Sequence, residues 1–307
     1  MNDTSNRIIV IQGPTASGKT SVAVQLAKHF NTVVLSADSR QFYKEMTIGT
    51  AKPTPDEMQG IKHYFINSHS IHDEVSAFRY AEEAKKLLIS LFKKHSIVIL
   101  AGGSGLFIEA LCKGLDPIPH DRKLHDKIVN EFNENGIDSL LMELKNKDPE
   151  FYNKIDKNNS YRVIRSIEAI RLSGKTMTAL RNEKNNKEEL FDTIYFTLHP
   201  ERKYLYRRIN KRVDLMLENG LLYEVNNLYK YRHLKSLNTV GYKEIFNQKD
   251  GLISLDNAID KIKQHSRNYA KRQLTWFINR TDSIVISFDE NEQEKNLIKK
   301  IIKHIES

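Results

Sequence analysis

Cysteine is almost absent from this sequence of 307 residues, which contains Cys112 alone. A single cysteine excludes an internal disulfide and fits a reducing compartment. The sequence also lacks a long apolar run, because the stretch at 8–11 is too short for a membrane span or a signal peptide. The 11 histidines show no zinc-binding spacing such as H-E-x-x-H, and a C-x-x-C pair is impossible. We therefore expect a cytoplasmic protein with no membrane partner.

Basic residues are in excess, with 48 Lys and Arg against 39 Asp and Glu and a formal net charge of +9. This charge suits a polyanionic partner, either nucleic acid or an anionic membrane surface. A lysine-rich solvated surface explains it equally well. The length and the 39% hydrophobic content suffice for one large domain or two modest ones.

A glycine-rich motif follows the first apolar run. It has the spacing G-x-x-x-x-G-K-T and lies between a predicted strand at 8–11 and a predicted helix over 21–27. The glycines let successive backbone N–H groups point at one anion, and the helix N-terminus adds partial positive charge. Lys19 supplies a full charge, and the Thr20 hydroxyl can hold Mg²⁺. The motif predicts a diphosphate or triphosphate site formed by Gly13, Pro14, Thr15, Ala16, Ser17, Gly18, Lys19 and Thr20.

Two further buried strands end in polar or small residues. The strand predicted at 33–37 is followed by Asp38, and the strand at 97–101 by the segment 102–105. The carboxyl ends of strands in open α/β sheets face the ligand crevice, so Asp38 is expected near the phosphate loop. A cap or turn role is the alternative for Asp38, and a tight strand-to-helix turn is the alternative for 102–105. The three strand–loop–helix units predict an α/β fold with a doubly wound parallel sheet.

The chain changes character after 117–119 and becomes polar and helical. Strand character returns at 192–198. We therefore expect residues 1–118 and 192–307 to form a P-loop core and residues 119–191 to form an inserted all-helical domain. The candidate helices of the insert run near 121–135, 137–147, 159–173 and 176–184.

Two helices predicted after the insert carry basic residues. The helix over 204–217 has arginines that can reach a phosphate from the side opposite the P-loop. In the helix over 267–277, basic residues are interleaved with aromatic ones, a pattern that suits contact with an RNA backbone and stacking on bases. Trp276, the one tryptophan, lies in this second helix, and a core position is its alternative.

The residues alone leave two reactions open. One is a small-molecule kinase in which Asp38 accepts a proton from a hydroxyl group. In the other, the P-loop holds a diphosphate leaving group while Asp38 deprotonates a nucleophile. A kinase of this type does not explain the helical insert or the basic aromatic helix.

Along nearly its whole length the sequence resembles the bacterial tRNA dimethylallyltransferase family. The family usually has Thr where this chain has Ser104, and Tyr where it has Phe107. The matching segments, in chain order, are 13–20, 36–41, 48–53, 102–106, 162–168 with 173–175, 212–214 with 220–221, 240–242 and 270–276.

The resemblance implies transfer of a dimethylallyl group from dimethylallyl diphosphate to N6 of the adenosine 3′-adjacent to the anticodon, with Mg²⁺ required and pyrophosphate released. It implies a monomer that binds the tRNA anticodon stem-loop through its helical insert and its basic helix. Prenyl transfer to free AMP, a P-loop kinase, and an RNA-binding protein switched by a nucleotide are the alternatives. The implied catalytic residues are Asp38, Lys19, Thr20 (also the metal ligand) and Arg212, and the implied tRNA-binding residues are Asp38, Ser39, Arg40, Gln41, Ser104, Arg162, Arg165, Gly241, Lys271 and Arg272.

Arg162, Arg165 and Glu168 are spaced by three and share a helix face. On spacing alone, an ordinary solvated charged face is favoured over an RNA-binding one.

Overall fold

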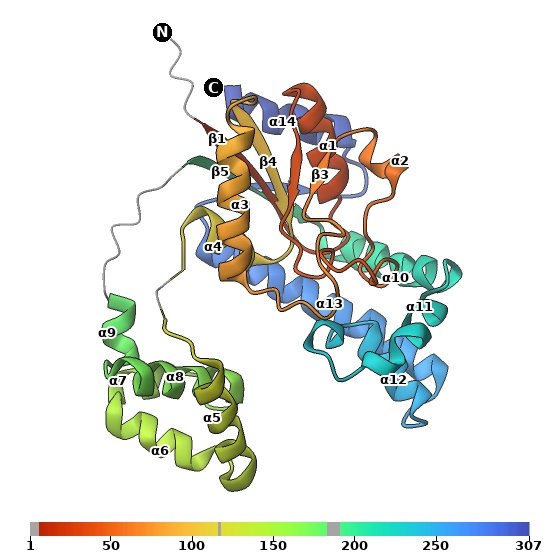
Figure 1. Ribbon diagram of the computed structural model, residues 1–307. Coiled ribbons are helices and arrows are strands. Elements are labelled where there is room, and N and C mark those ends of the chain that lie inside the picture. The colour runs from red at the N-terminus through yellow and green to blue at the C-terminus, as the bar shows by residue number, and fades with distance from the viewer. Residues whose placement is uncertain (1–5, 116–117, 183–190, 307) are drawn as a thin grey trace. The chain divides into compact units, whose positions relative to one another are not determined.

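The computed structural model describes residues 6–115, 118–182 and 191–306 (Figure 1). The chain divides into two compact units. The first consists of Met1–Lys113 with Glu189–Ser307, and the second of Gly114–Glu188. The helical segment is therefore an insertion within the first unit. The helix expected over 176–184 reaches residues 183 and 184, which lie outside the described residues.

The first unit is built on a six-stranded sheet with the strand order β3-β2-β4-β1-β5-β6. Every pairing between neighbouring strands is parallel, and Ile9 of the central strand β1 lies opposite Ile99 and Ile194. The doubly wound parallel sheet is thereby confirmed. The strands are β1 (Arg7–Gln12), β2 (Val34–Ser36), β3 (His63–Tyr64), β4 (Ile97–Gly102), β5 (Asp192–Pro200) and β6 (Ile284–Phe288).

Helices cover both faces of this sheet, which explains why its strands are continuous apolar runs. Ile9 and Ile11 of β1 are fully buried under α1 (Lys19–His29) and α14 (Glu294–Glu306), which pack side by side (Figure 1). Ile8 and Val10 point to the opposite face and are also fully buried. On that face α3 (Ala77–Leu91) packs against α4 (Gly105–Cys112).

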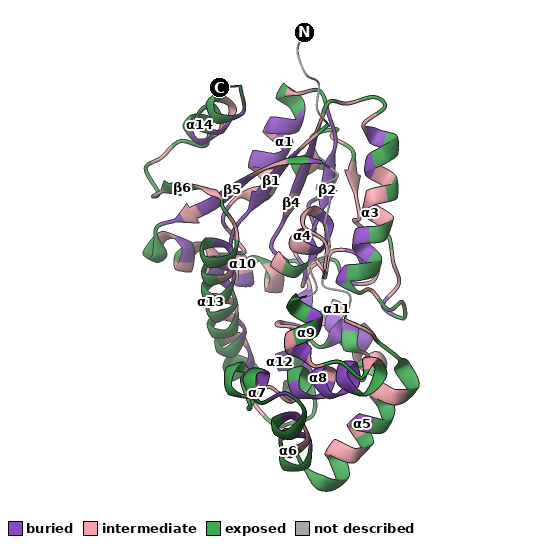
Figure 2. Ribbon diagram, turned by 90° about the vertical axis from the view of Figure 1, so that its left-hand side faces the viewer, coloured by how far each residue is buried: buried purple, intermediate pink, exposed green. Residues whose placement is uncertain are grey.

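The long helix α13 (Leu255–Arg280) contacts α4, α10 (Arg202–Glu218) and α12 (Tyr242–Lys249). Figure 2 shows buried positions along one side of α13 and exposed ones along the other. The Ser254 hydroxyl accepts a hydrogen bond from the Asn257 N–H and caps its start. The remaining helices of the first unit are α2 (Pro55–Met58), α11 (Leu221–Leu228) and the short 3₁₀ helices η1 (Tyr229–Tyr231) and η2 (Lys235–Leu237).

The second unit is entirely helical over its described residues. Its core gathers around α8 (Ser160–Ser173), whose Val163, Ile167 and Ala169 are fully buried. The other helices are α5 (Arg122–Asn135), α6 (Asp138–Lys147), α7 (Pro149–Lys154) and α9 (Met177–Asn182). Within the described ranges of the whole chain, no helix combines the length and the apolar character needed to cross a bilayer.

Candidate functional site

The glycine-rich segment 13–18 connects the end of β1 to the start of α1. Gly13 and Gly18 have φ angles of 151° and 91°, which residues with a side chain rarely adopt. A Cβ atom on Gly13 would also lie 2.8 Å from the carbonyl oxygen of Leu198 in β5. Within the part of the chain that the structure describes, the buried Ser17 Oγ has no hydrogen-bond partner. A tight loop with an unused hydroxyl, placed at a helix N-terminus, is suited to an anion.

Lys19 is the first residue of α1, and its Nζ donates a hydrogen bond to the Pro14 carbonyl oxygen at 2.7 Å. Loss of solvation lowers the pKa of Lys19 to about 7, the negative charge of Asp38 opposes that shift, and the positive charge of Arg212 adds to it. A phosphate anion in the loop would oppose the shift as Asp38 does. Anion binding above pH 7 is therefore coupled to proton uptake by Lys19. Thr20 follows in the same half-buried turn.

Gln273 of α13 joins the P-loop to the loop that follows β4. Its side-chain oxygen accepts a hydrogen bond from the Thr15 N–H at 2.9 Å, and its Nε2 donates to the Gly103 carbonyl oxygen at 2.8 Å. A Cβ atom on Gly103 would lie 2.4 Å from that Nε2, so glycine is needed for this contact. The two glycine-rich loops are thus held at a fixed separation by one buried amide.

Asp38 follows β2 at the carboxyl end of the sheet. A Cβ atom on Gly102 would lie 2.3 Å from the Ala37 carbonyl oxygen, so the ends of β2 and β4 are in direct contact. Asp38 Oδ1 accepts a hydrogen bond from the Arg40 N–H at 3.1 Å, which is the turn role weighed as its alternative. The charge of Asp38 also acts on the pKa of Lys19, so the carboxylate lies near the P-loop.

Helix α10 directs two arginines at this loop. Loss of solvation lowers the pKa of the Arg212 guanidinium, the charge of Asp38 opposes the shift, and the charge of Arg208 adds to it. Arg208 Nη2 lies 3.8 Å from the place that a Cβ atom on Gly18 would take. Arg208 Nη1 donates a hydrogen bond to the Tyr204 hydroxyl at 2.9 Å. Two guanidinium groups four residues apart therefore lie beside the anion loop.

Ser104 and Tyr269 lie beside Asp38. Ser104 Oγ accepts a hydrogen bond from the Ser39 N–H at 3.0 Å, and Tyr269 is hydrogen bonded to Ser104. Although 39% of Tyr269 is exposed, loss of solvation at its phenol, followed by the charge of Asp38, raises its pKa to about 12. The phenol therefore keeps its proton at neutral pH and can donate a hydrogen bond.

Phe107 belongs to a buried aromatic cluster. Its ring centroid lies 5.6 Å from that of Phe42 and 5.3 Å from that of Tyr80. Tyr80 donates a hydrogen bond to the Ser36 carbonyl oxygen at 3.1 Å. The phenylalanine therefore contributes an apolar packing contact at this position.

Arg40 and Gln41 both contact the protein itself. Arg40 Nη1 donates to the Ser236 carbonyl oxygen at 2.8 Å, and Gln41 Nε2 donates to the Ala51 carbonyl oxygen at 3.2 Å. These bonds tie the segment after Asp38 to the loop after Met46 and to η2.

The remaining predicted residues of the first unit lie on α12 and α13. Gly241 has a φ of 96° and its N–H donates to Glu244 Oε2 at 2.7 Å, which starts α12. Lys271 and Arg272 are exposed and, with Trp276, line a surface cavity of about 460 Å³ on α13. Trp276 is half-buried, and a Cβ atom on Gly105 would lie 2.2 Å from its Nε1. The tryptophan therefore packs on the start of α4 while part of it stays accessible.

Arg162 and Arg165 belong to α8 in the second unit. Arg162 is exposed, whereas Arg165 Nη1 forms an ion pair with Glu168 Oε2 at 2.5 Å. Glu168 is fully buried. The solvated charged face favoured from the spacing is therefore wrong for Glu168.

The structure brings the P-loop, Asp38, Ser104 and Arg212 to one edge of the sheet. The sequence indicates no role for Gln273, and it marks Arg208 and Tyr269 only as members of the basic helix over 204–217 and of the basic aromatic helix over 267–277. Gln273 lies three residues after Ala270 on the apolar face of a helix, and Arg208 lies four residues before Arg212. Contacts between a helix and loops that lie 170 or more residues away in the chain cannot be read from such local patterns.

The sequence and the fold are both similar to those of known proteins. The family model described as IPP transferase matches residues 41–281. The tRNA dimethylallyltransferase 1 of Bacteroides fragilis is 43% identical over 96% of this chain and 97% of its own length. The tRNA dimethylallyltransferase of Christiangramia forsetii is 45% identical over 95% of this chain and 96% of its own length.

Solved structures of related enzymes are similar to this chain in sequence and in fold. The full-length tRNA isopentenylpyrophosphate transferase of Bacillus halodurans is 35% identical, with a TM-score of 0.71 over 98% of this chain and 95% of that one. A eukaryotic dimethylallyltransferase acting on tRNA is 27% identical, with a TM-score of 0.82 over 97% of this chain and 78% of that one.

Proposed function

This chain belongs to the IPP transferase family, and we propose that it transfers a dimethylallyl group from dimethylallyl diphosphate to N6 of the adenosine 3′-adjacent to the anticodon in tRNA. Pyrophosphate is the second product. The observation that carries this proposal is that Asp38, which follows β2 at the carboxyl end of the sheet, lies near enough to the anion loop for its charge to act on both Lys19 and Arg212. A carboxylate base and a diphosphate cradle at one edge of the sheet are the two parts that the reaction needs.

The exocyclic amine of adenine is a weak nucleophile, because its lone pair is delocalised into the ring. In the proposed step, the bond from N6 to C1 of the allyl group forms while the bond from C1 to the bridging diphosphate oxygen breaks. The electron pair leaves with pyrophosphate, and the proton of N6 passes to Asp38. The substrate base must leave its RNA stack to reach this position.

Departure of pyrophosphate builds negative charge on the bridging oxygen. In the proposed step, Lys19, the N–H groups of the P-loop and Arg212 stabilise this charge. Arg208 adds a second guanidinium beside Gly18. The depressed pKa values of Lys19 and Arg212 follow from a cationic pocket with little solvent, and an incoming polyanion relieves the cost of that charge.

Mg²⁺ fits the residues of this loop. The buried Ser17 Oγ lacks a partner within the described ranges, and the Thr20 hydroxyl lies one residue beyond Lys19 at the helix start. Thr20 would hold the ion, which supplies Lewis-acid stabilisation of the diphosphate oxygens when bound.

The proposed tRNA contacts fall on both units. Ser39, Ser104 and Gly241 lie on loops or helix starts of the first unit, and Lys271 and Arg272 offer exposed charge to the RNA backbone. Arg40 and Gln41 would act chiefly by holding the loops that meet the RNA, since both already bond backbone carbonyl oxygens. The helical unit would contribute Arg162 and Arg165 to the grip on the anticodon stem-loop.

One chain supplies the proposed catalytic residues, which supports a monomer. The lone cysteine and the tRNA substrate support a cytoplasmic protein.

One assay tests the proposed function against the alternatives. The protein is incubated with Mg²⁺ and dimethylallyl diphosphate, together with tRNA or AMP, and in parallel with ATP and a hydroxylic acceptor. We expect pyrophosphate release and one prenyl group per tRNA, located by mass spectrometry on the adenosine beside the anticodon. Prenylated AMP as the favoured product, or phosphoryl transfer from ATP, would contradict the proposal.

A further inference from the structure

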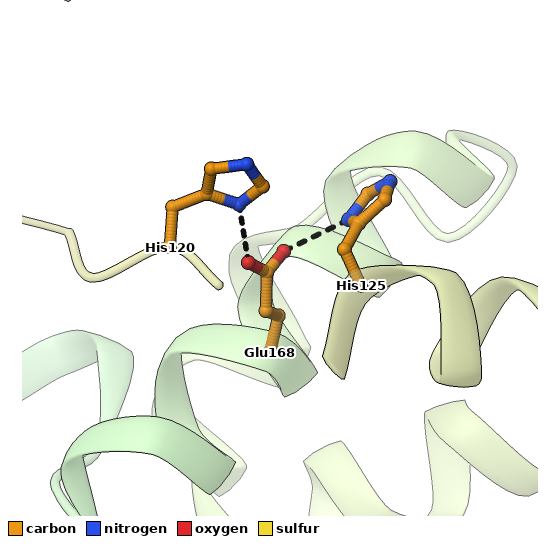
Figure 3. A group of neighbouring side chains, drawn as sticks. All are labelled: His120, His125 and Glu168. Atoms are coloured by element: carbon orange, nitrogen blue, oxygen red, sulfur yellow. Dashed lines mark hydrogen bonds and ion pairs between the residues drawn. The ribbon is translucent and has the colours of Figure 1, made fainter. Parts of the chain in front are cut away.

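Three potential metal ligands meet in the second unit, which holds none of the proposed catalytic residues. His120 lies just before α5, His125 in its first turn, and Glu168 on α8 (Figure 3). Their ligand atoms lie within 4.8 Å of one another. His120 Nδ1 is 2.5 Å from Glu168 Oε1, and His125 Nδ1 is 2.9 Å from Oε2. Each imidazole thus presents a nitrogen to a different oxygen of one carboxylate.

The carboxylate at the centre of this cluster is buried and is contacted by three side chains and one backbone N–H. Burial raises the pKa of Glu168, but hydrogen bonds from Arg165, His125 and His120 outweigh it and hold the pKa below its usual value. The Asp121 backbone N–H also donates to Oε1 at 3.0 Å and fixes the orientation of the carboxylate. A fully buried anion needs a cationic partner.

The protein groups alone do not satisfy this cluster. Arg165 Nη1 lies 2.9 Å from His120 Nδ1, and an arginine nitrogen can only donate. If His120 Nδ1 accepts the hydrogen bond from Arg165, it carries a lone pair and no proton. It then lies 2.5 Å from Glu168 Oε1 with no hydrogen between the two atoms. If His120 Nδ1 instead carries a proton and donates it to Glu168, it cannot accept a hydrogen bond from the Arg165 N–H. One of the two contacts is unfavourable in either case.

We propose that His120 Nδ1, His125 Nδ1 and Glu168 bind a divalent transition metal, with Zn²⁺ as the best match. Two imidazole nitrogens and one carboxylate oxygen form a ligand set that zinc uses, and water completes four-coordination. The bond from the Asp121 N–H to Oε1 is the outer contact that orients the carboxylate. This proposal does not depend on the prenyl-transfer function.

In the proposed complex, Zn²⁺ replaces Arg165 as the cation that pairs with the Glu168 carboxylate. The Arg165 side chain is 23% exposed, so its guanidinium has a route to solvent. The metal then ties the segment before α5 and the first turn of α5 to α8, the helix at the centre of the unit's core. Zinc and Arg165 compete for the same carboxylate, which provides a specific test.

The sequence conceals this site, because its ligands are spread over positions 120, 125 and 168. No short spacing such as H-E-x-x-H marks it, and the sequence reading of the histidines accordingly found no metal pattern. Only the packing of α5 on α8 brings the three side chains together.

The test uses the full-length protein, stripped with a chelator and kept in excess Mg²⁺ so that oxygen-rich sites are filled. Co²⁺ serves as a spectroscopic probe, and Zn²⁺ affinity is measured by competition with a chromophoric chelator. We expect one Zn²⁺ per chain and the visible absorption of four-coordinate Co²⁺. His120→Asn and His125→Asn should each weaken Zn²⁺ binding about tenfold or more. His233→Asn, which changes an exposed histidine of the first unit, should leave it unchanged.

Arg165→Gln separates this site from incidental metal binding, since removing the competing guanidinium should tighten Zn²⁺ binding several-fold. Circular dichroism checks that each variant is folded. If a variant is not folded, the Co²⁺ spectrum of the wild-type protein decides whether the site exists. The proposal is overturned if wild-type protein gives no four-coordinate Co²⁺ absorption. It is also overturned if both cluster-histidine variants bind Zn²⁺ as the wild type does, or if Arg165→Gln weakens binding.

Discussion

Replacement of Asp38 with alanine is expected to lower kcat by about 10²–10⁴-fold and to leave tRNA affinity nearly intact. The carboxylate is the proposed acceptor of the N6 proton, and without it the forming N6–C1 bond leaves a positive charge on the amine that no base neutralises. The Arg40 N–H also loses its acceptor, but this turn contact is small beside the loss of the base. Single-turnover kinetics with saturating tRNA and dimethylallyl diphosphate measures the chemical step.

Asp260→Ala is the matched control, because it removes an exposed carboxylate from α13 of the same unit. It should retain wild-type kcat. Unchanged single-turnover rates in Asp38→Ala would remove Asp38 from the role of base. A parallel loss of tRNA binding would assign it to RNA contact instead.

Replacement of Arg212 with alanine is expected to lower kcat/KM for dimethylallyl diphosphate by about 10²–10³-fold, with a much smaller change in the Kd for tRNA. The guanidinium is desolvated beside Lys19 and Asp38, where a stabilising charge on the departing diphosphate is worth most. Steady-state kinetics with varied prenyl diphosphate and a separate tRNA-binding measurement distinguish the two effects.

Arg207→Ala provides the comparison on the same helix. Arg207 forms an ion pair with Glu290, and its side chain is 62% exposed. Its loss should leave the use of dimethylallyl diphosphate nearly unchanged. If Arg212→Ala instead abolished tRNA binding and spared the use of dimethylallyl diphosphate, Arg212 would belong to the RNA interface.

The fold follows from local patterns wherever an element is long and apolar. The core strands were predicted because buried parallel strands are continuous runs of β-branched and aliphatic residues. Strand β3 (His63–Tyr64) was missed, since two half-buried residues carry no period. Helix α7 was missed because it has only six residues, although Asp148 caps it and Pro149 starts it. Helix α13 runs for 26 residues, far beyond the predicted 267–277.

The candidate site was predictable only where it consists of local motifs. The loop 13–20 and the polar end of β2 can be predicted from the sequence, because the residues that determine their chemistry and their backbone geometry are adjacent in the chain. Gln273 bonds two loops that lie at least 170 residues away in the chain. Glu168 was expected on a solvated face because spacing by three does not reveal which helix packs against it. The roles of Gln273 and Glu168 both depend on tertiary contacts that the local sequence does not show.

The central claim is that the loop 13–20 holds a prenyl diphosphate rather than a nucleoside triphosphate. Calorimetric titration of the full-length protein with dimethylallyl diphosphate in Mg²⁺, repeated in the presence of pyrophosphate or ATP, tests it most directly. We predict saturable binding that pyrophosphate displaces, that ATP leaves unchanged and that Lys19→Gln abolishes. Tight binding of ATP that dimethylallyl diphosphate cannot displace would contradict the account.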